Sequence, residues 1–170
     1  MSSAGTRQPR HVTTRAGPLL DEKKAMRHHL AVLYRAYIDA ILEGRKSIEC
    51  RFAKMGNIPH GLVEPGDLIW LKESCGPIRA VCGVRMVWCF ERLTPARMDW
   101  LCRRFNAGIG APGAFWRQHR DARTAMLIWL DNVCAMEPFL VKKSDRRAWV
   151  VLAAPPVPGE ALVSAVDGLV

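Results

Sequence analysis

The stretch Gly44-Arg45-Lys46-Ser47-Ile48-Glu49-Cys50-Arg51 separates a predicted helix from a predicted strand and sets the fold expected for this chain of 170 residues. Before it, apolar side chains recur at the spacing of one helix face, and Gly44 supplies the left-handed backbone position where such a helix can end. From Ile48 onward apolar and polar residues alternate, which is typical of a half-buried strand. The pattern predicts a helix over residues 34–41 and a strand over residues 48–52.

The charged side chains of this stretch are expected to meet on one face of the strand. Because side chains alternate along a strand, Glu49 and Arg51 should point to the same side. Strict alternation places Lys46 on the other side, but Lys46 lies in the turn, where a bulge can redirect it toward Glu49. Charge pairs on the outer face of a strand are commonly solvated and contribute little, so spacing alone does not distinguish a site from an ordinary surface pair.

The same stretch carries a resemblance to a known family. It reproduces the pattern G-x-K-x-x-E-x-R, and through this pattern the chain resembles the ASCH domain family, with matches at Gly44, Lys46, Glu49 and Arg51. Two further segments resemble the family in the expected order: residues 65–84, with a turn and core strands, and residues 146–152, which resemble the closing strand. The resemblance implies a PUA-like fold of the α+β class, a small mixed or antiparallel β-barrel flanked by helices.

The sequence fits one domain between two tails. A chain of this length buries roughly two thirds of its unfolded surface, so no second domain is needed. Residues 1–27 are expected to form a flexible basic arm, because they are rich in Ser, Thr, Arg and Gly without a sustained apolar period. Their composition also fits an organelle transit peptide, although no amphipathic helix is evident. The ASCH domain is expected over residues 28–152 and a C-terminal tail over residues 153–170.

Periodic patterns fill the predicted domain. Strands are expected at residues 30–33, 68–71, 78–90, 124–130, 133–141 and 148–152, and further helices at about 95–104 and 115–120. A turn at Asp131-Asn132 is expected to separate two of these strands. Gly83 is expected to allow the bend at which a small barrel closes.

Composition excludes several classes of protein. With 49% hydrophobic and 24% charged residues the chain is typical of a soluble globule. No apolar run approaches the roughly 18 residues that a membrane span needs, so we expect a cytoplasmic protein without membrane contact. Its six cysteines include no C-x-x-C pair, so we expect reduced core thiols instead of a zinc site or a disulfide scaffold. No metal and no cofactor are expected.

The net charge of +9 favours phosphate-rich partners. The first 27 positions contain six Lys and Arg residues and two acidic residues, so a net four of the nine positive charges belong to the predicted arm. Within the domain, candidate binding residues come from the motif, from a strand end that the resemblance places near the cleft, and from the densest basic cluster of the chain. They are Lys46, Glu49 and Arg51; Lys72, Glu73 and Ser74; and Lys142, Lys143, Arg146 and Arg147.

A further basic region surrounds Trp116. It holds Arg117, His119, Arg120 and Arg123, and the combination of cations with an aromatic ring suits single-stranded nucleic acid. A tryptophan in a short helix is more often a core anchor. Both interpretations are open at the level of sequence.

The leading functional hypothesis is an RNA- or nucleotide-binding module with a basic cleft around the motif. Lys46 and Arg51 would meet phosphate or a base edge, and Glu49 would accept a hydrogen bond from a base amino group. The alternative is a hydrolase in which Lys46 and Glu49 are catalytic and cleave single-stranded RNA by general acid–base chemistry. The resemblance also includes acetylcytidine amidohydrolases, thought to have a threonine where this chain has Glu49. The exact ligand, catalysis and oligomeric state are left open.

Overall fold

The computed structural model describes residues 25–54, 59, 61–144 and 146–165. Residues 1–24 of the predicted arm and residues 166–170 of the predicted tail therefore lie outside the described residues. The elements are β1 (His28–Leu33), α1 (Arg35–Leu42), β2 (Ile48–Ala53), β3 (Leu68–Glu73), β4 (Ile78–Phe90), α2 (Pro95–Ile109), α3 (Gly113–Gln118), β5 (Thr124–Phe139) and β6 (Trp149–Leu152). None of the helices in this described part is long and apolar enough to cross a membrane.

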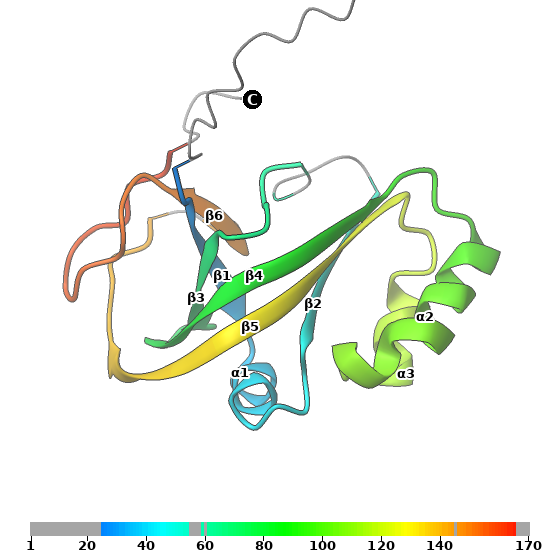
Figure 1. Cartoon of the computed structure of the whole chain (residues 1–170), viewed down its shortest axis with the longest axis horizontal. Coiled ribbons are helices and arrows are strands. Elements are labelled where there is room, and N and C mark those ends of the chain that lie inside the picture. The colour runs from blue at the N-terminus through cyan, green and yellow to red at the C-terminus, as the bar shows by residue number, and fades with distance from the viewer. Residues whose placement is uncertain (1–24, 55–58, 60, 145, 166–170) are drawn as a thin grey trace, which may run out of the picture.

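Six strands form one mixed sheet in the order β2-β5-β4-β3-β1-β6 (Figure 1). β1 and β3 run parallel, and the other neighbouring pairs are antiparallel. The α+β fold with a small mixed barrel is therefore confirmed. The barrel is a half-barrel, however: the edge strands β2 and β6 are not neighbours in the sheet, so the closure predicted from Gly83 does not occur through strand pairing. A seam between these two edges is left for side chains to fill.

The predicted turn at Asp131-Asn132 is wrong, because β5 runs unbroken over Thr124–Phe139. The irregularity of the sequence appears instead as a bulge, with a φ of 46° at Asn132 and shifts of register against β4 near Gly83. A Cβ atom on Gly83 would lie 2.4 Å from Oδ1 of Asp131. A larger residue at this position would therefore require the Asp131 side chain to move.

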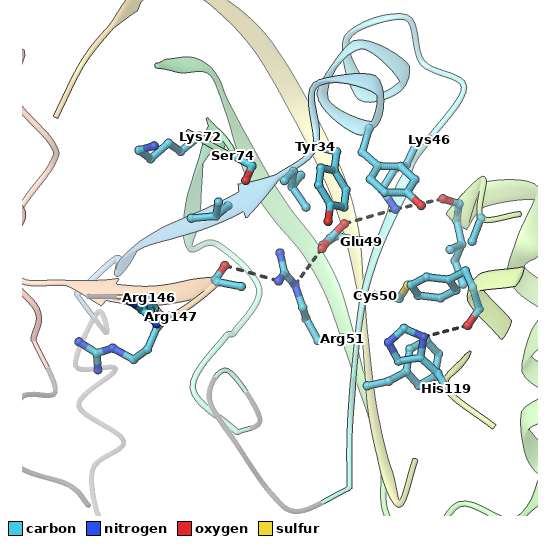
Figure 2. A pocket seen from close by; sticks show the side chains of 18 of the residues that line it. Tyr34, Lys46, Glu49, Cys50, Arg51, Lys72, Ser74, His119, Arg146 and Arg147 are labelled. Carbon is cyan, nitrogen blue, oxygen red and sulfur yellow. Dashed lines mark hydrogen bonds and ion pairs between the residues drawn. The ribbon is translucent and has the colours of Figure 1, made fainter. Parts of the chain in front are cut away.

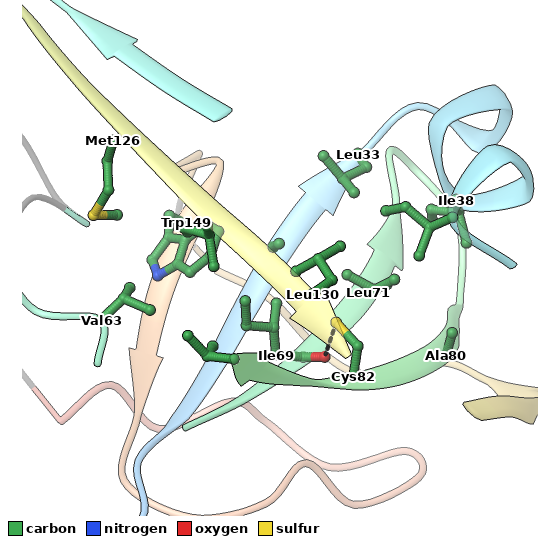
Figure 3. Packing of buried hydrophobic residues seen from close by; sticks show 14 residues of the cluster. Leu33, Ile38, Val63, Ile69, Leu71, Ala80, Cys82, Met126, Leu130 and Trp149 are labelled. Carbon is green, nitrogen blue, oxygen red and sulfur yellow. Dashed lines mark hydrogen bonds between the residues drawn. The ribbon is translucent and has the colours of Figure 1, made fainter. Parts of the chain in front are cut away.

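Two hydrophobic clusters hold the helices against the sheet. In the first, Ile38 and Ile41 of α1 belong to one cluster with buried residues of β1, β3, β4, β5 and β6 (Figure 3). In the second, Met98, Leu101 and Phe105 of α2 pack against β2 and β5. α1 therefore closes one end of the curled sheet, while α2 and α3 lie together beside β2 (Figure 1).

The helices after β4 begin largely as predicted but end elsewhere. Thr94 caps α2 with its side chain, as expected for threonine before proline. α2 continues to Ile109, beyond the predicted end near residue 104, and Gly110 ends it with a φ of 67°. In α3, Trp116 is 7% exposed and its Nε1 donates to Oδ1 of Asn106 at 2.9 Å. The interpretation of Trp116 as a core anchor is therefore confirmed.

The expectation of six core thiols is wrong for half of the cysteines. All are free; Cys50 and Cys82 are buried, whereas Cys75, Cys89 and Cys134 are exposed. Cys75 lies in a turn with a φ of 59°, and the other two exposed thiols lie on the outward side of long strands. Apolar neighbours in the sequence do not establish burial, because successive strand residues point to opposite faces.

The described part of the predicted tail returns to the sheet. The amide of Ala153 donates to the carbonyl oxygen of Val163 at 2.9 Å, and the amide of Ala165 donates to that of Val151 at 2.8 Å. Leu162 packs against the small cluster that contains Val150 and Leu152 of β6. This segment therefore covers the outer edge of β6.

Candidate functional site

The motif residues lie where α1 passes into β2, at the seam of the half-barrel (Figure 2). Gly44 has a φ of 74°, and the amide of Lys46 then donates to the carbonyl oxygen of Ala40 at 2.9 Å. The chain thus folds back on α1 before β2 starts at Ile48. This turn, and not a bulge in the strand, directs Lys46 toward Glu49.

Lys46 is only 4% exposed, and its ammonium group has three acceptors. Nζ donates to the carbonyl oxygens of Ile48 at 2.8 Å and Ile109 at 3.0 Å, and it lies 3.3 Å from Oε2 of Glu49. Lys46 therefore ties the start of β2 to the end of α2 and neutralises a buried carboxylate. For Lys46 to contact a phosphate, as predicted from the sequence, its ammonium group would have to give up one of these three interactions.

Glu49 lies between two cations. Its Oε1 is 2.9 Å from Nε of Arg51, as an ion pair without hydrogen-bond alignment, so these two side chains share a face as predicted. Nη1 of Arg51 donates to the carbonyl oxygen of Ala148 at 3.4 Å, and the guanidinium lies 5.1 Å from the ring of Trp149. Arg51 thus spans the seam between β2 and β6. Its Nη2 is buried and has no hydrogen-bond acceptor among the described residues.

These residues line a pocket of about 640 Å³, which we call the motif pocket. Its described lining holds six cationic side chains, from Lys46, Arg51, Lys72, Lys143, Arg146 and Arg147. Glu49 is the only carboxylate among the lining residues that the structure describes. Of the other residues predicted from the sequence, Ser74 lines the motif pocket, whereas Glu73 and Lys142 do not. The excess of positive charge favours an anionic ligand.

The end of β3 supplies another wall of the motif pocket. Lys72 is 8% exposed, and its Nζ donates to the carbonyl oxygens of Glu73 at 3.1 Å and Gly76 at 2.7 Å. Burial lowers the pKa of Lys72, and the neighbouring cation of Lys143 acts in the same direction. The amide of Ser74 donates to the carbonyl oxygen of Leu33 at 2.8 Å, which joins this turn to the end of β1. Lys72 is therefore held by the turn that follows its own strand.

One wall of the motif pocket is aromatic and was not predicted from the sequence. Ring centroids lie 5.7 Å apart for Phe52 and Phe115, 5.4 Å for Phe52 and His119, and 4.4 Å for Phe115 and His119. We call these three residues the aromatic wall. Tyr34, 72% exposed, also lines the motif pocket, and Figure 2 shows it together with Glu49 and His119. The spacing of Phe115 and His119, one turn of helix apart, was the available signal in the sequence.

The motif pocket offers little for thiol or metal chemistry in its described part. Cys50 lines it, but burial raises the pKa of this thiol to about 12, so the nucleophilic thiolate is scarce near neutral pH. The described residues contain no group of three or more His, Cys, Asp or Glu side chains able to hold a metal ion.

Comparison with known proteins identifies the fold. A crystal structure of the ASCH protein from Zymomonas mobilis with a tyrosine-to-phenylalanine substitution matches with a TM-score of 0.54 and 16% identity, over 66% of this chain and 74% of that chain. The structure of the ASCH protein from the same organism without this substitution matches with a TM-score of 0.52 and 14% identity, over 65% and 71% of the two chains. No protein-family model and no curated protein matches the sequence. The chain therefore has the fold of the ASCH domain proteins.

Proposed function

We propose that this protein binds RNA or a nucleotide in the motif pocket. The observation that carries the proposal is the lining, which combines six cationic side chains and one carboxylate with an aromatic wall. Cations neutralise phosphate groups, and aromatic rings stack on bases. A nucleotide presents both of these features within one ligand.

Arg51 is the anchoring group in this proposal. Its buried Nη2 lacks an acceptor among the described residues, so a small shift of the side chain toward the pocket would let a phosphate or base oxygen accept a hydrogen bond from it. The carboxylate of Glu49 holds the guanidinium of Arg51 at its Nε atom, and Lys46 balances the charge of Glu49. Lys143, Arg146 and Arg147 also line the pocket, and their positive charge would attract further phosphates.

Direct binding of fluorescently labelled single-stranded RNA and of unlabelled nucleotides tests the proposal. Arg51→Ala should weaken binding about 10- to 150-fold, because a hydrogen bond to a charged group is worth roughly 1.5–3 kcal/mol. Lys143→Ala should weaken it modestly and reduce the slope of log K against log salt by about 0.7 for a single strand.

Lys142→Ala is the matched control, because Lys142 belongs to the same basic cluster but is exposed outside the lining of the motif pocket. Its affinity should equal that of the wild type. Binding that is insensitive to salt, or equal losses for Lys142→Ala and Lys143→Ala, would contradict the proposal.

A second candidate function, cleavage of RNA, is supported by the contact between the ammonium of Lys46 and the carboxylate of Glu49 at the pocket wall. Such a pair is suited to moving protons between an RNA 2′-hydroxyl and a leaving oxygen. If the protein is a ribonuclease, Lys46→Arg and Glu49→Gln should each abolish turnover of labelled RNA in a folded protein. Turnover that survives both changes would come from another site or from a contaminant.

Hydrolysis of acetylated cytidine has weaker support. The residue at position 49 is a buried glutamate paired with two cations, and it supplies no nucleophilic hydroxyl. Acetylated cytidine is therefore a useful control substrate in the cleavage assay, and we expect no turnover of it.

A further inference from the structure

A second cavity, of about 870 Å³, opens beside α3, and we call it the α3 cavity. Its described lining holds four cationic side chains and one carboxylate, that of Asp121, which pairs with Lys54. Arg120 lies 3.9 Å from Asp99, an exposed and therefore weak pair. No carboxylate among the described residues pairs with the other two cations, Arg117 and Arg123. The α3 cavity therefore has an excess of positive charge that the described chain does not balance.

α3 and the residues directly after it separate the α3 cavity from the motif pocket. Phe115 and His119 line the motif pocket, whereas Arg117 and Arg120 line the α3 cavity. The sequence thus alternates between an aromatic and a cationic side as it passes around one short helix. Since a helix with its side chains is about 10–12 Å across, the two sites are about one helix diameter apart.

The end of β2 also contributes side chains to both the motif pocket and the α3 cavity. Phe52 lines the motif pocket, and Lys54, two residues later, lines the α3 cavity. Two residues of extended chain span about 7 Å. The aromatic wall of Phe52, Phe115 and His119, all three half-buried, therefore lies between the two cationic sites.

We propose that the α3 cavity binds the phosphate backbone of a single-stranded RNA whose neighbouring nucleotide occupies the motif pocket. The inference rests on the proposed function of the motif pocket and specifies its ligand as a strand instead of a mononucleotide. Alternating cations and aromatic rings are the arrangement that single strands use, with bases stacked on rings and phosphates on cations. An acidic peptide would pair with the cations but would leave the aromatic wall without a stacking partner.

The test compares affinities for a mononucleotide, a short single-stranded RNA that fills the motif pocket alone, and a longer strand that reaches both sites. The wild type should bind the longer strand at least tenfold more tightly than the mononucleotide. In Arg117→Ala/Arg123→Ala most of this gain should be lost, and the salt slope should fall by about 1.4, for two single-strand phosphate contacts. Binding of the mononucleotide should not change.

Two further variants complete the experiment. Arg85→Ala/Arg104→Ala removes the same charge from exposed positions that line neither site, and it should keep the full gain for the longer strand. Arg117→Lys/Arg123→Lys should keep most of the gain, because phosphate is recognised here through charge, and it also reveals any loss due to misfolding.

The outcomes separate the two proposals. If the wild type binds RNA but the Arg117/Arg123 alanine variant behaves like its control, this inference is overturned while the proposed function stands. A polyglutamate peptide that binds as tightly as RNA of equal charge would also overturn it. If neither RNA nor nucleotide binds the wild type, the proposed function fails and this inference fails with it.

Discussion

Replacing Lys46 with methionine should destabilise the protein far more than the loss of a surface lysine would. The ammonium of Lys46 is buried against the carboxylate of Glu49 and the carbonyl oxygens of Ile48 and Ile109. Methionine fills similar space without the charge or the donors. The variant would therefore leave Glu49 buried with Arg51 as its one remaining cation among the described residues, and two carbonyl oxygens would lose a donor.

The expected loss is about 3–5 kcal/mol in the free energy of unfolding, the usual effect of removing one partner of a buried ion pair. Whole domains are stable by only about 5–15 kcal/mol, so this is a large fraction of the total. For a chain of this size 1 kcal/mol corresponds to about 2–4 °C in Tm, which gives a fall of about 6–20 °C. By contrast, Lys142→Met changes an exposed lysine and should stay within about 0.5 kcal/mol.

Urea and thermal unfolding of Lys46→Met, Glu49→Gln and the double variant form a double-mutant cycle that isolates the pair. Because neutral glutamine no longer needs the ammonium, the double variant should be more stable than the sum of the single losses predicts, by about 1–3 kcal/mol. If Lys46→Met unfolds like Lys142→Met, the buried ammonium contributes no more than a surface lysine. If the two single losses simply add, Lys46 and Glu49 do not stabilise each other. Either result would contradict this prediction.

Three other predictions concern stability and thiol chemistry. Gly44→Ala should lower the free energy of unfolding in urea by about 1–2 kcal/mol through backbone strain alone, since φ is 74° and no atom would contact the new methyl group. Gly44→Asn should cost less, because asparagine tolerates the left-handed region better. Equal stability of the wild type and both variants would contradict this prediction. Burial lowers the pKa of His29 below 6.5, with Nε2 3.0 Å from Oδ2 of Asp67 and Nδ1 accepting from Nε1 of Trp149 at 3.3 Å. As the pH falls, the unfolded chain therefore takes up a proton at this histidine before the folded protein does. The stability that neutral His29 contributes is complete above about pH 6.5 and is lost as the pH falls toward the folded pKa. In urea unfolding, His29→Gln should lose this dependence of stability on pH. In native protein Cys75, Cys89 and Cys134 should react rapidly with a chromogenic disulfide, whereas Cys50 and Cys82, whose pKa values burial raises to about 12, should react only on unfolding.

The sequence by itself determined the features that depend on neighbouring residues. The end of α1 just before Gly44, the shared face of Glu49 and Arg51, and the cap of α2 at Thr94 all follow from local periodicity and backbone preference. The sequence did not predict that β5 continues unbroken through Asn132. Asparagine favours turns, but it also fits a bulge within a strand that is paired with a partner strand.

Only the tertiary structure decided what surrounds these residues. The carbonyl acceptor of Lys46 at Ile109 is 63 positions away in the sequence, and that of Arg51 at Ala148 is 97 positions away. The first contact exists because Gly108 lets α2 approach β2; a Cβ atom there would lie 2.8 Å from Cδ1 of Ile48. Burial and charge pairing of the motif, and the placement of α3 between two cationic sites, depend on such close approaches between distant segments. Periodicity along the chain carries no information about them, because it reports only which side of an element faces the core.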